Sequence, residues 1–177
     1  MNAKRLLCLA GTTLTLTCLT SVAMAQTDLP ESVRVPAGHK ISLETTGVGK
    51  ITYECRAKAN STTEMEWAFV GPDAVLNDRG GKQVGTYYGP PATWEAKDGS
   101  KVTGTQVAVA PSSAGNLPYQ LVKANPAQGK GAMSDVAYIQ RTALKGGVAP
   151  SSACTASNKG AKEVVQYQAD YLFWSAS

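Results

Sequence analysis

The chain has 177 residues with 17 Lys and Arg, 13 Asp and Glu and a formal net charge of +4, and its basic residues are scattered along the sequence. So small an excess of positive charge argues against binding to nucleic acid or to an anionic membrane, both of which need a concentrated basic patch. The length suits one domain that can bury a hydrophobic core.

The first 25 residues have the three zones of a secretory signal peptide. Two basic residues are followed by an apolar stretch at 6–19 and by the small-x-small cleavage site Ala23-Met24-Ala25. The apolar stretch is shorter than the roughly 20 residues of a membrane-spanning helix, and no later segment is long enough. We therefore expect a cleaved signal peptide at 1–25, no membrane span, and a single β-rich domain at 26–177 that is periplasmic or secreted.

Beyond the signal, apolar residues alternate with polar ones at a period of two, which is typical of strands with one buried face. Four runs carry the pattern: Ile41, Leu43 and Thr45; Ile51, Tyr53 and Cys55; Met65, Trp67 and Phe69; and Val165, Tyr167, Ala169, Tyr171 and Phe173. No window of ten or more residues has the periodicity of an amphipathic helix.

Turn signals separate these runs at fairly regular intervals. They are Pro72-Asp73, the segment 77–81, Asp98-Gly99, Asn125-Pro126 and Gly146-Gly147. Asp98-Gly99 predicts a two-residue hairpin turn between strands around Trp94 and 102–109. The pattern as a whole predicts an all-β fold, an antiparallel sandwich or barrel of about eight to ten strands, and does not choose between the two.

Two cysteines, Cys55 and Cys154, remain once the signal peptide is removed. In an oxidising compartment an isolated pair is most simply a disulfide. It would close a loop of about 100 residues, worth up to roughly 4–5 kcal/mol in the chain-entropy model. The alternative is a reactive thiol, which needs a lowered pKa of which the sequence gives no sign. We predict a structural disulfide that staples the fold.

Catalytic motifs are scarce. His39 is the single histidine, which excludes a multi-histidine zinc site, and we expect neither a metal nor a cofactor. His39 beside a serine, or an acidic pair such as Glu95 and Asp98, would support a hydrolase, but no Gly-x-Ser-x-Gly elbow is present. We favour a non-catalytic protein and keep the hydrolase as the alternative.

The segment from Gly85 to Glu95 combines aromatic and polar side chains. Tyr87, Tyr88, Trp94 and Glu95 are the candidate ligand-binding residues, because rings beside a few polar groups suit stacking on a sugar or another flat ligand. The alternative is that Trp94 and one of the tyrosines belong to the core.

Several segments of the mature chain, in the same order along the sequence, resemble the family Domain of Unknown Function 3455. Its members are exported bacterial proteins with fungal relatives. The matching segments are Val35-Pro36-Ala37-Gly38-His39-Lys40, Tyr53-Glu54-Cys55, 67–74, 93–100, Tyr138-Ile139-Gln140-Arg141, 146–150 with Cys154, and Ala169-Asp170-Tyr171. The resemblance implies no assigned function. It supports pairing of Cys55 with Cys154. Many relatives have a His-Tyr pair where this chain has Tyr87-Tyr88. If that histidine forms a site with His39 in relatives, the site is altered here.

The leading hypothesis is an exported, non-catalytic β domain that binds a small molecule or glycan-like ligand, or a partner, through the loop around Tyr87 to Trp94. A hydrolase and a structural or stress-protective envelope protein are the alternatives. The oligomeric state is left open, since the edge strands of a sandwich would be able to pair between copies.

Overall fold

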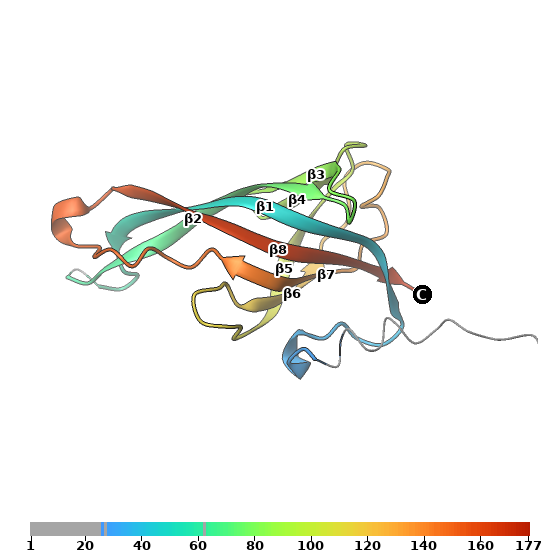
Figure 1. Cartoon of the computed structure of the whole chain (residues 1–177), viewed down its shortest axis with the longest axis horizontal. Helices are drawn as coiled ribbons and strands as arrows, with labels where there is room; N and C mark the ends of the chain where they lie inside the picture. Colours follow the sequence, from blue (N-terminus) through green and yellow to red (C-terminus); the bar gives the residue numbers. More distant parts are fainter. Residues whose placement is uncertain (1–25, 27, 62) are drawn as a thin grey trace, which may run out of the picture.

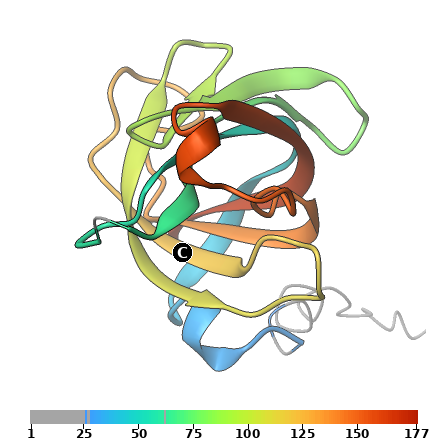
Figure 2. The same ribbon diagram turned by 90° about the vertical axis from the view of Figure 1, so that its left-hand side faces the viewer.

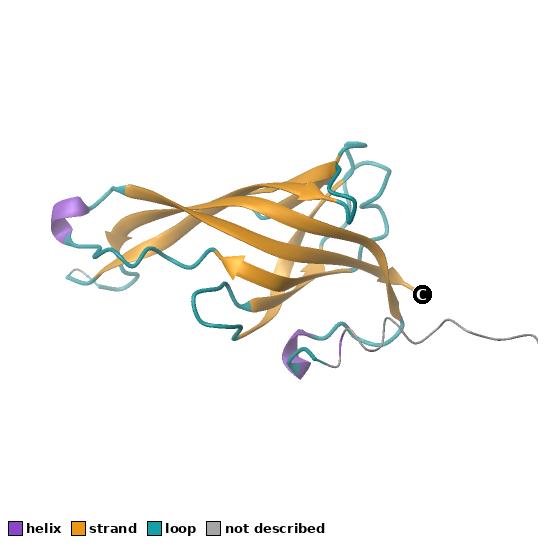
Figure 3. Ribbon diagram, in the orientation of Figure 1, coloured by secondary structure: helices purple, strands orange, loops and turns teal. Residues whose placement is uncertain are grey.

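The computed structural model describes residues 26, 28–61 and 63–177, and the predicted signal peptide lies outside the described residues. Eight antiparallel strands pair in sequence order, and β8 pairs with β1 to close a barrel (Figures 1 and 3). The strands are β1 (His39–Ala57), β2 (Met65–Asn77), β3 (Gln83–Tyr88), β4 (Thr93–Ala96), β5 (Lys101–Ala110), β6 (Tyr119–Ala124), β7 (Tyr138–Gly146) and β8 (Lys162–Ala176). The all-β prediction is confirmed, and of its two architectures the structure adopts the barrel.

Alternation along the strands builds the interior. In β8 the side chains of Tyr167, Ala169, Tyr171 and Phe173 are buried, as the period of two predicts. The pairing of β8 with β1, which we call the seam of the barrel, is long. It runs from His39 opposite Ala176 to residue 54 opposite residue 162. Because β1 and β8 pair along almost their whole length, no edge strand is left at this seam.

The predicted hairpin at Asp98-Gly99 joins β4 to β5, with one difference in its turn. Its loop has three residues, Lys97 to Gly99, because the backbone N–H of Ala96 donates to the carbonyl of Ser100 across it. Gly99 has a φ of 86°, the left-handed conformation that such a three-residue loop requires at its last position. Glycine adopts this conformation without the steric cost of a Cβ.

The predicted turn at Pro72-Asp73 is wrong, because both residues lie within β2. Pro72 pairs with Ile51 of β1. On the other side of β2, pairing with β3 begins only at Asp73, opposite Tyr88. Proline cannot donate a backbone hydrogen bond, so it is tolerated where one side of the strand has no neighbour.

A second hydrophobic cluster lies outside the barrel, beneath the segment that precedes β1. This segment contains the short 3-10 helix η1 (Glu31–Val33), and Val33 and Val35 pack against Trp174, Leu121 and Ala110 of the outer barrel wall. The buried Gln140 side chain donates from Nε2 to the Val33 carbonyl at 2.7 Å. The segment is therefore an integral part of the fold, drawn in blue below the barrel in Figure 1.

Cys55 and Cys154 form a disulfide, as predicted. Cys55 lies near the end of β1, and Cys154 lies in the long connection between β7 and β8, just before the 3-10 helix η2 (Ala156–Asn158). The bond therefore fastens this connection to the barrel. Figure 2 views the barrel from the end that carries η2.

Candidate functional site

The β3–β4 hairpin divides the four predicted ligand-binding residues between the two faces of the barrel wall. Tyr87 and Trp94 point inward and stack on each other, with ring centroids 4.6 Å apart and planes 17° from parallel. Tyr88 and Glu95 point outward, and the Tyr88 hydroxyl donates to Glu95 Oε2 at 2.6 Å. The structure therefore groups the four residues into two pairs. Tyr87 and Trp94 lie on the inner side of the sheet, and Tyr88 and Glu95 lie on its outer side.

A cavity of about 340 Å³ opens beside this hairpin. We call it the mouth cavity. Its lining comes from β2, β3, the β3–β4 turn, β5, β6 and the connection before it, and β7. The lining residues are Phe69, Pro72, Tyr87, Gly89, Pro90, Ala92, Gln106, Val109, Leu117, Pro118, Gln120 and Arg141. Its volume lies at the lower end of the range of about 300–1,000 Å³ usual for small-molecule sites.

Gly71 fixes the position of the β3–β4 turn at the rim of the mouth cavity. A Cβ atom at this position would lie 2.2 Å from the carbonyl oxygen of Gly89, so only glycine permits the approach. The turn, 89–92, therefore packs directly against the backbone of β2. Three residues of the turn, including Pro90, thereby become part of the cavity wall.

Apolar side chains form most of the rim. Phe69 is 50% exposed and its ring meets that of Tyr53 edge to face, with centroids 6.0 Å apart. The sequence pattern placed Phe69 on the inward face of its strand. The structure explains its exposure, because Phe69 borders the open end of the barrel and lines the cavity. Val109, 45% exposed, also lines this opening. Exposed apolar groups gathered around a concavity are typical of ligand sites.

Polar groups on the cavity wall are few. Gln120 Nε2 donates to Gln106 Oε1 at 2.7 Å, so these two amides are paired with each other. Arg141 projects from β7, and its Nε and Nη2 both donate to the carbonyl of Pro118, at 3.3 and 3.0 Å. Arg141 is the one charged residue among those that line the cavity.

Four tyrosines lie on the interior side of the barrel near Arg141. The Tyr53 hydroxyl donates to the Gly147 carbonyl at 2.8 Å, and the hydroxyls of Tyr167 and Tyr171 are 3.3 Å apart. Burial raises the pKa of Tyr53, Tyr87, Tyr167 and Tyr171, and the positive charge of Arg141 opposes this shift in each case. The four hydroxyls therefore keep their protons well above neutral pH.

We expect the protein to lose stability in alkali through these tyrosines. Their folded-state pKa values are raised, so above about pH 10 the unfolded chain releases protons that the folded state retains. The contribution of these tyrosines to the free energy of unfolding is fully present below about pH 10. It falls as the pH rises toward their folded-state pKa values, by up to about 1.4 kcal/mol per pH unit for each tyrosine. Urea denaturation of wild type and Tyr171→Phe at pH 9, 10 and 11 measures the slope. It should be shallower in the variant, and equal slopes would contradict the expectation.

His39 lies away from the mouth cavity. It is the first residue of β1 and does not line the cavity, whereas the cavity-lining Pro72 pairs with Ile51, much further along β1. Its Nδ1 lies 3.0 Å from the Pro36 carbonyl, and its ring packs edge to face on that of Tyr138, with centroids 4.9 Å apart. The structure does not bring His39 together with Glu95 or Asp98 in any hydrogen bond or ion pair between described residues.

Asp98 holds a turn in place. Its carboxylate accepts hydrogen bonds from Ser100, through both its hydroxyl and its backbone N–H, and from the backbone N–H of Ala132. These bonds, led by that from the Ser100 hydroxyl, lower the pKa of Asp98. The carboxylate thereby connects the β4–β5 turn to the connection between β6 and β7. Of the predicted acidic pair, Glu95 bonds to Tyr88 and Asp98 bonds to this turn.

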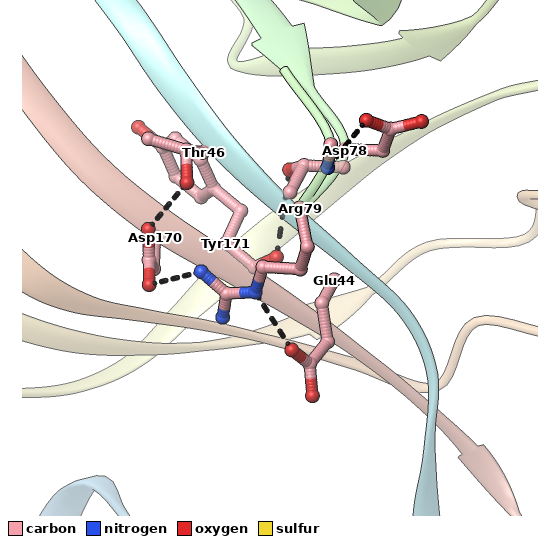
Figure 4. A network of polar contacts seen from close by, with 8 residues as sticks. Glu44, Thr46, Asp78, Arg79, Asp170 and Tyr171 are labelled. Atoms are coloured by element: carbon pink, nitrogen blue, oxygen red, sulfur yellow. Dashed lines mark hydrogen bonds and ion pairs between the residues drawn. The ribbon is translucent and has the colours of Figure 1, made fainter. Parts of the chain in front are cut away.

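A second polar network lies on the outer wall of the barrel and bridges the paired strands β1 and β8. Arg79, in the β2–β3 connection, donates to Glu44 of β1 at 2.9 Å and to Asp170 of β8 at 2.7 Å (Figure 4). Thr46 donates to the other oxygen of Asp170. Hydrogen bonds to Asp170 and Glu44 raise the pKa of Arg79. The network fastens the connection across the closing pair of strands, and its charges are already paired.

No group of three or more potential metal ligands occurs among the described residues. No helix in the described part of the chain is long and apolar enough to cross a membrane.

The cavity lining includes residues that sequence reasoning missed, above all Arg141, Gln106 and Gln120. One signal pointed to Arg141: it is two residues after the buried Ile139 and therefore shares its inward face. A cation on the inward face of a strand is unusual and can indicate a binding site. Nothing in the sequence indicated that Arg141 lies near Tyr87, since their proximity depends on how the sheet closes.

The fold and the cavity define a small disulfide-bonded antiparallel barrel with an apolar opening at one end. Residues 36–175 match the family described as Protein of unknown function (DUF3455), which confirms the predicted resemblance. The chain belongs to this family. No curated protein and no solved structure matches it.

Proposed function

We propose that this protein is exported and binds a small organic molecule in the mouth cavity. The observation that carries the proposal is the cavity itself, about 340 Å³ in volume, walled mostly by apolar side chains with a few convergent polar groups. Part of the predicted aromatic segment belongs to this wall, through Tyr87 and the turn that follows it. The outward pair Tyr88 and Glu95 is not required.

Export to the periplasm or beyond is part of the proposal. It is supported by the signal-peptide pattern of residues 1–25 and by the disulfide, which persists in oxidising compartments. A ligand-binding role is favoured over hydrolysis because neither His39 nor any carboxylate belongs to the cavity lining.

The test uses N-phenyl-1-naphthylamine, an uncharged dye that fluoresces when it enters an apolar site. We expect saturable binding to the oxidised mature protein. Val109→Trp should weaken binding at least about ten-fold, because the indole fills the opening and a factor of ten corresponds to only about 1.4 kcal/mol. The equilibrium dissociation constant is measured by fluorescence titration.

Val107→Trp is the matched control. Val107 lies on the same strand, is 55% exposed and does not line the cavity, so the substitution should leave the dye affinity unchanged. Absence of saturable binding to the wild type, or an equal loss in both variants, would reject the mouth cavity as the binding site.

A further inference from the structure

The mouth cavity has a single charged group on its wall, and that charge is positive. Arg141 has no Asp or Glu within ion-pair distance in the part of the chain that the structure describes. The other lining residues are apolar or neutral. A half-buried guanidinium without a counter-ion is costly, because the surrounding protein solvates it less well than water does.

The guanidinium is held in a fixed orientation with donors to spare. Its Nε and one Nη2 hydrogen are directed at the Pro118 carbonyl. Arginine has five N–H donors in one plane, so both Nη1 hydrogens and the second Nη2 hydrogen are left over. A planar fork held in this way suits a carboxylate, which takes two parallel hydrogen bonds from it.

The neighbouring tyrosines do not supply the missing negative charge. Tyr87 lines the cavity beside Arg141, and burial raises the pKa of its hydroxyl. At neutral pH this hydroxyl is uncharged and cannot neutralise the guanidinium. The counter-charge must therefore come from solvent or from a bound molecule.

We propose that the mouth cavity selects a monoanion, a carboxylate carried on an apolar ring system, whose charged group binds Arg141. The inference rests on the proposed function and adds the chemical class of the ligand. The rings contact the apolar rim formed by Phe69, Val109 and Leu117, while the carboxylate reaches the guanidinium. One cation on the wall matches one negative charge on the ligand.

The experiment compares two probes of the same shape, 1-naphthaleneacetate and the uncharged 1-naphthaleneacetamide, by isothermal titration calorimetry. We expect the wild type to bind the acid at least about ten-fold more tightly than the amide, because hydrogen bonds to a charged acceptor are roughly twice as strong as neutral ones. In Arg141→Met the two affinities should become equal through weaker binding of the acid. Val109→Trp is the control and should weaken both.

The outcomes separate the two proposals. If the wild type binds both probes equally, the anion preference is wrong and the cavity proposal stands. If neither probe nor the uncharged dye binds, both proposals are wrong. Since the decisive comparison is made on the wild type, it does not depend on the folding of Arg141→Met.

Discussion

Removal of the disulfide is expected to lower the free energy of unfolding by about 4–5 kcal/mol. Cys55 and Cys154 are 99 residues apart, and a cross-link over such a distance strongly restricts the unfolded chain. We would replace both cysteines with alanine, because Cys55 is fully buried and a serine hydroxyl there would add its own cost. Guanidinium denaturation of the wild type and of the double variant measures the difference.

Single variants provide the control. Cys55→Ala and Cys154→Ala each break the same bond and should lose nearly as much stability as the double variant. A reducing agent should destabilise the wild type and leave the double variant unaffected. A double variant within about 1 kcal/mol of the oxidised wild type would show that the cross-link contributes little, a result also known for disulfides whose unfolded state retains structure.

Trp94→Ala is expected to cost about 3–5 kcal/mol, the usual range for removing a large buried aromatic side chain. The Trp94 side chain is 1% exposed, stacks on Tyr87 and meets the ring of Tyr171 edge to face at 5.9 Å. Its indole N–H has no hydrogen-bond partner among the described residues. Trp94→Phe should therefore cost much less than the alanine substitution, since it loses volume but no hydrogen bond. Urea denaturation measures both variants.

Tyr88→Ala is the matched control for Trp94. Tyr88 lies on the same hairpin, faces outward and is 38% exposed, so its replacement should change stability by no more than about 1 kcal/mol. Similar losses in Trp94→Ala and Tyr88→Ala would contradict the division of this hairpin into an inner and an outer face.

The strands were largely predictable because alternation is a local property. The run from Val165 to Phe173 and the hairpin at Gly99 were both visible in the sequence. The prediction at Pro72 was wrong because a proline usually indicates a turn. Proline is also tolerated in a strand that has no neighbour on one side, but the sequence does not show where this occurs. The choice between sandwich and barrel was out of reach, because it depends on whether the first and last strands pair.

The candidate site was less predictable than the fold, for the same reason. The aromatic segment drew attention to Tyr87, which lines the cavity, and to Tyr88, which faces the other way. Their opposite orientations follow from the period of two once the segment is known to be a regular strand. Arg141 and Phe69 come from strands far apart in sequence, and only closure of the barrel places them around one cavity.

The seam between β1 and β8 also dictates when the native state can form. Residues 39 and 176, which pair at one end of this seam, are far apart in the sequence, so β1 is made well before its partner β8, and the other six strands lie between them. Contacts between residues so far apart in sequence bring no gain in free energy until a large loop has closed. Folds dominated by such contacts form slowly. A chain emerging from the ribosome therefore cannot complete its barrel before β8 has been made. Until then β1 has β2 as its one partner in the sheet, and its other edge is unpaired.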